Sequence, residues 1–278
     1  MFKRAALLGS VGAALVATSA QAQYNAVKGS VSFGIVQATP GAFDIVVDLG
    51  NFTRFNSGTA AILLGGSSSS EAYQGIGPAQ ASENRFANSD VVATFGNLNN
   101  LQFSAFGVTT DVANNARPLI TKARSNQAVQ SAPWAAASST SLGGTGNILE
   151  GVRVNAANNG VDFAGAGNTS TKEGIPAATG YSTAVAPAGY TAMEGATGGA
   201  FGVNDIRRLD LYAMVGGATT GTSSPGDYLG YFEYQGDGDL WFVPENFVPV
   251  PEASTYGLVA GAGLLFMALR RQLGSKTA

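Results

Sequence analysis

The side chains in this chain that can carry out chemistry are carboxylates, hydroxyls and aromatic rings. Its 278 residues include no histidine and no cysteine. Histidine is the commonest general base and metal ligand, and the cysteine thiolate is another frequent nucleophile and zinc ligand. The sequence therefore excludes serine–histidine hydrolases, zinc hydrolases, histidine-ligated haem proteins, thiol catalysis and disulfide bonds.

The most compact acidic pair is Asp237-Gly238-Asp239. Two carboxylates at this spacing can share a hard cation such as Ca²⁺ in an exposed loop. No further carboxylate follows at the spacing of an EF-hand loop, and Asp and Gly are also the residues that tight turns use. We therefore expect a hairpin turn, retain Asp237 and Asp239 as a calcium candidate, and expect no other metal and no cofactor.

Four aromatic residues lie close together in the same part of the chain: Tyr228, Tyr231, Tyr234 and Trp241. Aromatic rings can stack on sugar rings, so these residues are a candidate glycan-binding set. Strand alternation places Tyr228 and Tyr234 on one face and Tyr231 on the other. Part of the set is then expected to pack in the core, and core packing is the alternative interpretation for all four.

Glycoside hydrolysis needs two carboxyl groups about 5–10 Å apart in a cleft. Six carboxylates are available, and nothing in their spacing singles out a pair: Asp44, Asp48, Glu150, Glu173, Glu194 and Glu233. Asp44 and Asp48 share a strand parity, which predicts one exposed face for both. We assign no catalytic residue and expect a non-enzymatic protein, with a glycoside hydrolase or lyase as the enzymatic alternative.

Short apolar segments punctuated by glycine predict strands in two regions. In the first, between residues 30 and 108, Val31, Phe33 and Ile35 alternate with residues for the opposite face. Its further candidate strands are 43–49, 60–64, 91–95 and 101–105. In the second, between residues 206 and 243, segments 228–234 and 239–243 indicate a hairpin.

Residues 111–204 are rich in Gly, Ala, Ser, Thr and Asn, so few of them can bury much apolar area. We expect long loops there, with 148–154 and 160–163 as candidate strands and no long amphipathic helix. The pattern favours an all-β domain, an antiparallel sandwich or jelly roll with long Gly/Ala/Asn-rich loops. Charged residues are only 12% of the chain and form no basic stripe, so nucleic acid is not an expected partner.

The first 22 residues have the three parts of a secretory signal peptide. Lys3 and Arg4 form a positive start, a short apolar stretch follows, and Ala20-Gln21-Ala22 provides a small-x-small cleavage site. This pattern predicts a signal helix, export through the Sec machinery and a mature chain beginning at Gln23. Residues 23–247 are then the extracellular β-rich domain.

The last segment, 248–278, combines a proline-containing stretch, an apolar run and a basic end. The apolar run 256–269 is shorter than the roughly 20 residues of a usual membrane span. It carries no charge until the basic tail 270–278, where Arg270, Arg271 and Lys276 would remain on the cytoplasmic side. We expect a short membrane helix with a basic stop, and a buried terminal helix is the alternative.

The residues before the apolar run read Val250-Pro251-Glu252-Ala253-Ser254-Thr255. This three-part tail resembles the PEP-CTERM sorting signal of Gram-negative bacteria, in which a Pro-Glu-Pro-type motif precedes a short hydrophobic helix and a basic end. Ala253 stands where a second proline is expected. The resemblance covers about 30 residues and the expected signal peptide, and it does not extend to the domain between them.

The resemblance implies processing by an exosortase, a membrane enzyme that acts near the motif. It also implies transient anchoring in the inner membrane, followed by location at the cell surface or in the extracellular matrix, with exopolysaccharide and biofilm as the associated material. The sequence thus predicts an exported, non-enzymatic surface or matrix protein. A carbohydrate-binding adhesin is the alternative function.

Overall fold

The computed structural model describes residues 29–37, 43–56, 58–76, 79–110, 116–135, 137–165, 168–174, 193–214, 216–217, 226–247 and 267. Its helices are α1 (Thr53–Asn56), α2 (Asn88–Phe95) and α3 (Ser139–Asn159), and η1 (Tyr73–Gly75) is a 3₁₀ turn. Its strands are β1 (Ser30–Gln37), β2 (Phe43–Asn51), β3 (Ile62–Gly65), β4 (Ser70–Glu71), β5 (Gln80–Ala81), β6 (Leu101–Thr110), β7 (Ala116–Ala123), β8 (Ala137–Ser138), β9 (Val161–Asp162), β10 (Ser170–Gly174), β11 (Gly195–Ala196), β12 (Ile206–Ala213), β13 (Gly216–Gly217), β14 (Asp227–Gln235) and β15 (Leu240–Pro244).

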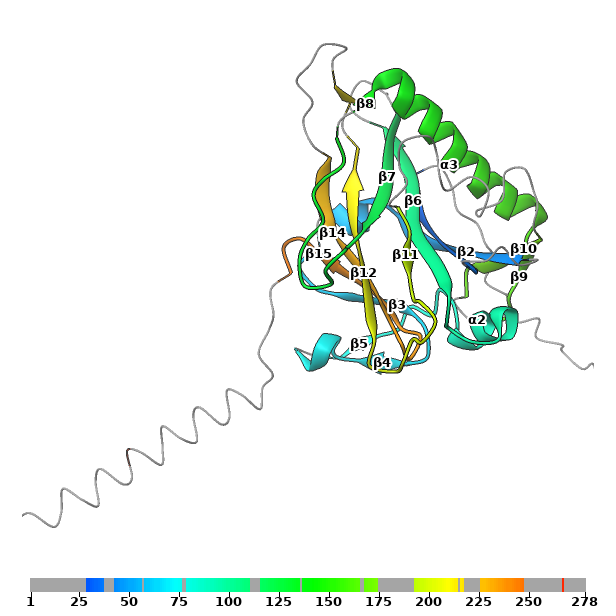
Figure 1. Ribbon diagram of the computed structural model, residues 1–278, viewed down its shortest axis with the longest axis vertical. Helices are drawn as coiled ribbons and strands as arrows, with labels where there is room; N and C mark the ends of the chain where they lie inside the picture. Colours follow the sequence, from blue (N-terminus) through cyan, green and yellow to red (C-terminus); the bar gives the residue numbers. More distant parts are fainter. Residues whose placement is uncertain are drawn as a thin grey trace, which may run out of the picture.

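One large antiparallel sheet organises the fold. Its strand order is β3-β15-β14-β12-β7-β6-β1-β2-β10-β9, and β11 pairs with β6. The sheet curls around one interior, and α3 crosses the outside of β6 and β7 (Figure 1). The small pairs β4–β5 and β8–β13 lie apart from it.

A short segment, residues 83–87, links the two ends of the curled sheet. Beside β3, the amide of Arg85 donates to the carbonyl of Leu64 over 2.9 Å. The carbonyl of Arg85 in turn accepts from the amide of Thr169 over 2.8 Å, and the carbonyl of Thr169 accepts from Asp48 of β2 over 3.1 Å. The segment therefore carries backbone hydrogen bonding from the β3 end to the β2–β10 end.

The interior of the curled sheet holds the main hydrophobic core. Alternation along β1 sends Val31, Phe33 and Ile35 inward, as the sequence predicts. They meet residues of the hairpin β14–β15, where Phe33 lies 6.0 Å from Phe232 between ring centroids. Because strands from both predicted regions supply this core, the two halves of the chain fold as one unit.

The outer face of the sheet is covered in two places. Helix α3 begins at Ser139 and is capped by Ser138, whose side chain accepts from the Ser141 amide. Its apolar stripe packs on the outside of β1, β2, β6, β7 and β12 and includes Leu142, Leu149, Val152 and Ala156. The segment around η1 covers Leu63, Trp241 and Val243 on the outside of β3 and β15.

The prediction of a mostly antiparallel β domain is confirmed, and so are the hairpin and the strands predicted at 31–35 and 43–49, which lie within β1 and β2. A sandwich or jelly roll is not confirmed, because the long strands form one curled sheet. The predicted strand at 148–154 is wrong, since these residues lie inside α3. The expectation of no long amphipathic helix in 111–204 is wrong for the same reason, because α3 has 21 residues and an apolar stripe. The predicted strand at 91–95 is also wrong, because the run belongs to α2. Region 111–204 also contains β7, which the sequence did not reveal.

The predicted signal helix 1–22 and nearly all of the segment 248–278 lie outside the described residues. Among the residues that the structure does describe, no helix is both long enough and apolar enough to span a membrane.

Candidate functional site

A bulge in β14 decides which aromatic side chains share a face. Between β12 and β14 the register shifts, so that Leu211 faces Gly230 while Tyr212 faces Tyr228. Gly230 has a φ of +137°, and a Cβ atom there would lie 2.3 Å from the carbonyl oxygen of Val243. The bulge places Tyr228 on the same outer face as Tyr231, where simple alternation predicted opposite faces.

Two guanidinium groups lie over the ring of Tyr231. The Cζ atoms of Arg124 and Arg208 are 4.4 Å and 5.5 Å from the ring centroid. Arg124 donates to Oδ1 of Asp210 from Nε (2.9 Å) and Nη2 (2.6 Å), and Oδ2 of Asp210 accepts from the Ser131 amide. Asp210 is fully buried, so its charge is compensated by the arginine and the backbone.

The other arginine, Arg208, pairs with the buried carboxylate of Glu233 on β14. Nε of Arg208 donates to Oε2 of Glu233 over 2.7 Å, and Glu233 has no exposed surface. The same carboxylate accepts from the hydroxyl of Tyr73 (2.9 Å) and from Nε2 of Gln235 (2.8 Å). The Tyr73 and Tyr231 hydroxyls lie 2.8 Å apart, so η1 is joined to the sheet through this carboxylate.

We call this set the aromatic–arginine cluster: Tyr73, Arg124, Arg208, Asp210, Tyr228, Tyr231 and Glu233. Burial and the charge of Glu233 raise the pKa of Tyr73. Burial and the charge of Asp210 likewise raise the pKa of Tyr228. Both phenols are therefore neutral hydrogen-bonding groups at physiological pH. The cluster offers hydroxyl and guanidinium groups beside the half-buried ring of Tyr231, a chemistry suited to binding hydroxylated ligands.

The other two aromatic candidates do not belong to this face. Tyr234 is fully buried in the interior, stacked on Phe201 with 6.1 Å between ring centroids. Trp241 is also fully buried, under the ring of Tyr73 at 5.3 Å, and its Nε1 donates to Oε1 of Glu71 over 3.2 Å. Only Tyr228 and Tyr231 of the four predicted residues are brought together on a partly exposed surface.

The calcium candidates lie at the predicted hairpin turn between β14 and β15. The amide of Asp239 donates to Oδ1 of Asp237 over 3.0 Å, while Oδ1 of Asp239 accepts from the amides of Ser67 (2.7 Å) and Ser68 (3.0 Å). The two carboxylates therefore bind different backbone groups. Within the described ranges, no three Asp, Glu, His or Cys side chains converge as a metal-binding group.

The carboxylates considered for glycoside hydrolysis are mostly enclosed. Asp44 and Asp48 are buried, so the prediction that they share an exposed face is wrong: Val46, which lies between them on β2, packs in one cluster with Leu149 and Val152 of α3. Glu150 of α3 forms a two-bond ion pair with Arg153, at 2.6 Å and 2.9 Å.

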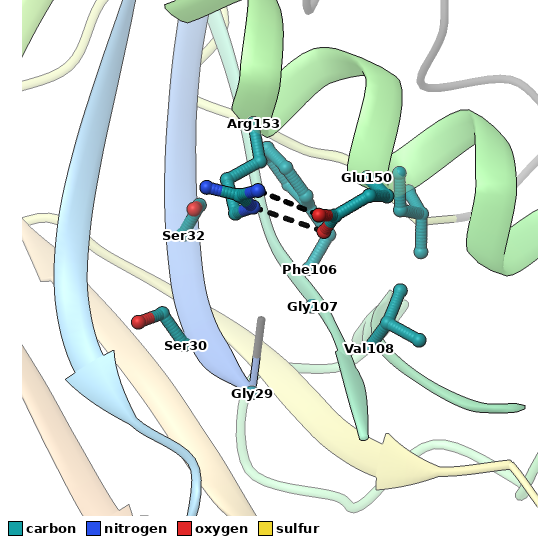
Figure 2. A pocket seen from close by; sticks show the side chains of 9 residues that line it. Gly29, Ser30, Ser32, Phe106, Gly107, Val108, Glu150 and Arg153 are labelled. Carbon is teal, nitrogen blue, oxygen red and sulfur yellow. Dashed lines mark hydrogen bonds and ion pairs between the residues drawn. The ribbon is translucent and has the colours of Figure 1, made fainter. Parts of the chain in front are cut away.

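Figure 2 shows this ion pair over Ser30 and Ser32 of β1, beside a cavity with room for about one water molecule. A cavity of this size does not admit a sugar ring. Glu233 belongs to the aromatic–arginine cluster, where it is held by Arg208 rather than presented to a cleft.

The residues of the predicted sorting and cleavage signals lie outside the described part of the chain: Ala20, Ala22, Val250–Thr255, Arg270, Arg271 and Lys276. Comparison with protein-family models, curated proteins and solved structures yields no match.

Sequence reasoning missed the arginines and the remote tyrosine of the cluster. Arg124 follows the unpredicted strand β7, and Tyr73 lies in η1, far from β14 in sequence. One signal was available: Arg208 and Asp210 share one face of β12, opposite Glu233 and Tyr231 on β14, which places one charge pair, a further carboxylate and one ring on neighbouring strands.

Proposed function

We propose that this protein is exported and acts as a non-enzymatic surface or extracellular-matrix protein, sorted by a PEP-CTERM-type signal and associated with exopolysaccharide. The observation that carries the proposal is the three-part tail, in which Val250–Thr255 precedes an uncharged apolar run and a basic end. Together with the signal pattern at 1–22, this order of segments is typical of a protein that is exported to the membrane and then processed.

The described domain agrees with this role in two respects. Its long strands enclose one apolar core without any disulfide, and the chain has no cysteine to form one. Two of its buried carboxylates, Asp210 and Glu233, are paired with arginines of the aromatic–arginine cluster, and charged residues make up only 12% of the chain. A signal helix and a short membrane helix flanking the domain complete the proposed arrangement.

The sorting proposal is tested by the mature C-terminus. Native protein is purified from membrane, cell-surface and medium fractions, and intact-mass spectrometry defines where the chain ends. We expect surface or medium protein that ends near Pro251–Thr255, with the basic tail removed. Recovery of the mature protein with Arg270–Ala278 still attached would contradict the proposed route.

A second function, glycan binding, is favoured by one specific observation. Tyr231 keeps partial exposure while its ring contacts two arginine guanidinium groups and lies beside the hydroxyl groups of Tyr73 and Tyr228. Planar guanidinium groups and phenol hydroxyls can bind sugar hydroxyls, and an aromatic edge supports the apolar face of a ring. In this alternative the protein is a carbohydrate-binding adhesin that recognises exopolysaccharide.

Glycan-array binding of the purified protein separates the two functions. Selective binding that is lost in Tyr231→Ala supports the adhesin, whereas no binding of any glycan supports a passive matrix protein. Phe43→Ala is the matched control, because Phe43 is 40% exposed and also carries a cation, Lys172, 3.9 Å from its ring centroid. Equal loss in both variants would show that the aromatic–arginine cluster is not the binding surface.

A further inference from the structure

Asp239 carries a buried oxygen that no donor reaches. The residue has no exposed surface, and its Oδ1 accepts from the Ser67 amide, the Ser67 hydroxyl and the Ser68 amide. Its Oδ2 has no hydrogen-bond partner. A buried carboxylate oxygen without a hydrogen-bond donor is costly unless a proton or a positive partner compensates it.

A second carboxylate lies against the first. Glu71 of β4 accepts from the Ser68 hydroxyl at Oε2 (3.3 Å) and from Trp241 Nε1 at Oε1 (3.2 Å). Ser68 therefore bridges the two carboxylates, because its amide donates to Asp239 while its hydroxyl donates to Glu71. The two carboxyl groups lie within hydrogen-bonding reach of each other, and Asp237 adds negative charge nearby. Such a pair requires either a shared proton or a cation.

A second buried oxygen without a hydrogen-bond partner lies at the same turn. The side-chain Oδ1 of Asn88, at the start of α2, is buried and has no hydrogen-bond partner. Its Nδ2 donates to the carbonyl of Asp237 over 3.0 Å, which holds the amide against the turn. A Cβ atom on Gly238 would lie 2.4 Å from Asn88 Oδ1, and one on Gly66 would lie 2.5 Å from Asp239 Oδ1. Glycine at both positions lets Asn88, the Ser67 loop and Asp239 approach closely.

We propose that Glu71 and Asp239 bind one Ca²⁺ ion, with the amide oxygen of Asn88 as a neutral ligand. Carboxylate and amide oxygens are the ligands that Ca²⁺ prefers, and water can fill its remaining positions. The charge of the ion would neutralise both carboxylates, and Asp239 Oδ2, which lacks a hydrogen-bond partner, would become a ligand. Asp237 contributes negative charge nearby, and its Oδ1 accepts from the Asp239 amide. The ion would tie β4 and α2 to the β14–β15 turn.

The test is the response of thermal unfolding to calcium chloride. The purified full-length chain is treated with EDTA, and its Tm is followed as CaCl₂ is added, with MgCl₂ and NaCl series in parallel. Two variants remove one ligand charge each and keep the hydrogen-bonding shape: Glu71→Gln and Asp239→Asn. The control is Asp227→Asn, which removes an exposed carboxylate paired with Arg117. Far-UV circular dichroism verifies that each variant is folded.

We expect Ca²⁺ to raise Tm in the wild type and in Asp227→Asn, and to have little effect in the two ligand variants. At a Ca²⁺ concentration 100 times the Kd, the folding equilibrium constant increases about 100-fold. A Kd of about 10⁻⁴ to 10⁻³ M is typical of extracellular calcium modules.

Two results would overturn the proposal. One is an equal calcium response in wild type, Glu71→Gln and Asp239→Asn, which would place binding elsewhere. The other is no calcium response in the wild type, together with a carboxyl NMR titration in which Glu71 and Asp239 share a proton. The outcome does not depend on whether the protein is sorted or binds glycans.

Discussion

The buried carboxylate of Glu233 allows a quantitative test of the aromatic–arginine cluster. In Glu233→Gln the side chain keeps its shape but loses its charge, which leaves Arg208 without a carboxylate. Arg208 is enclosed, with 13% of its side chain exposed, and Glu233 has no exposed surface. Removing one partner of a buried ion pair costs about 3–5 kcal/mol, because the remaining charge is desolvated without compensation. A loss of this size is a large share of an ordinary domain's stability.

The matched comparison is the exposed ion pair between Arg117 and Asp227, whose carboxylate side chain is 60% exposed. Solvent screening limits such a pair to about 0–1 kcal/mol, so Asp227→Asn is expected to be nearly neutral. Both variants and the wild type are unfolded in urea and followed by the fluorescence of Trp134 and Trp241, which are buried. With an m-value of about 2 kcal/mol/M, Glu233→Gln lowers the midpoint by about 2 M.

A double variant separates loss of the pair from loss of packing. Replacing both Arg208 and Glu233 by leucine removes the two charges together, and such replacements are often close to neutral. We therefore expect Arg208→Leu/Glu233→Leu to be more stable than Glu233→Gln. The reasoning is refuted if Glu233→Gln costs no more than Asp227→Asn, or if the double variant is the least stable of the set.

Three further predictions concern single positions. Gly230→Ala should destabilise the domain by about 1–3 kcal/mol, because a non-glycine residue is strained at this φ, and an unchanged urea midpoint would contradict the bulge. Gly144→Ala should stabilise it by about 0.5–1 kcal/mol in the same assay, since Gly144 is exposed inside α3 and a Cβ atom there meets nothing within 4 Å. Burial raises the pKa of Asp48 in the folded state. The protonated carboxyl therefore stabilises the fold fully below the pKa of Asp48 in the unfolded chain, and this stabilisation is lost as the pH rises through its pKa in the folded protein. Asp48→Asn should therefore be more favourable relative to wild type at about pH 7 than at about pH 4, and a pH-independent difference would rule out this titration.

Local patterns predicted the strands that have one apolar face. Val31, Phe33 and Ile35 on β1 alternate cleanly, and their side chains line the interior. The β14–β15 hairpin was equally clear, because Gly and Asp mark its turn between apolar strands. In both cases the residues next to each other in sequence were sufficient.

Other elements depend on packing that neighbouring residues do not reveal. The composition of α3 is poor in strong helix formers, and its helical signal is a sparse stripe through Leu142, Leu149 and Val152. Strand β7 contains Pro118, which argues against a central strand. The aromatic–arginine cluster could not be predicted from the sequence for a further reason. The Gly230 bulge places Tyr228 on the sheet face opposite to the one that alternation predicts, and Tyr73 belongs to η1, which is distant in sequence.

The segment 83–87 has a consequence for how copies of this protein meet at high concentration. An open sheet presents a row of unpaired amides and carbonyls, which can template pairing with another chain. Here the edge of β3 is covered by residues of the same chain. The amides of Glu83 and Arg85 donate hydrogen bonds to the carbonyls of Leu63 and Leu64. Neighbouring molecules packed in a dense layer cannot extend the sheet at β3, so they meet there through side chains instead.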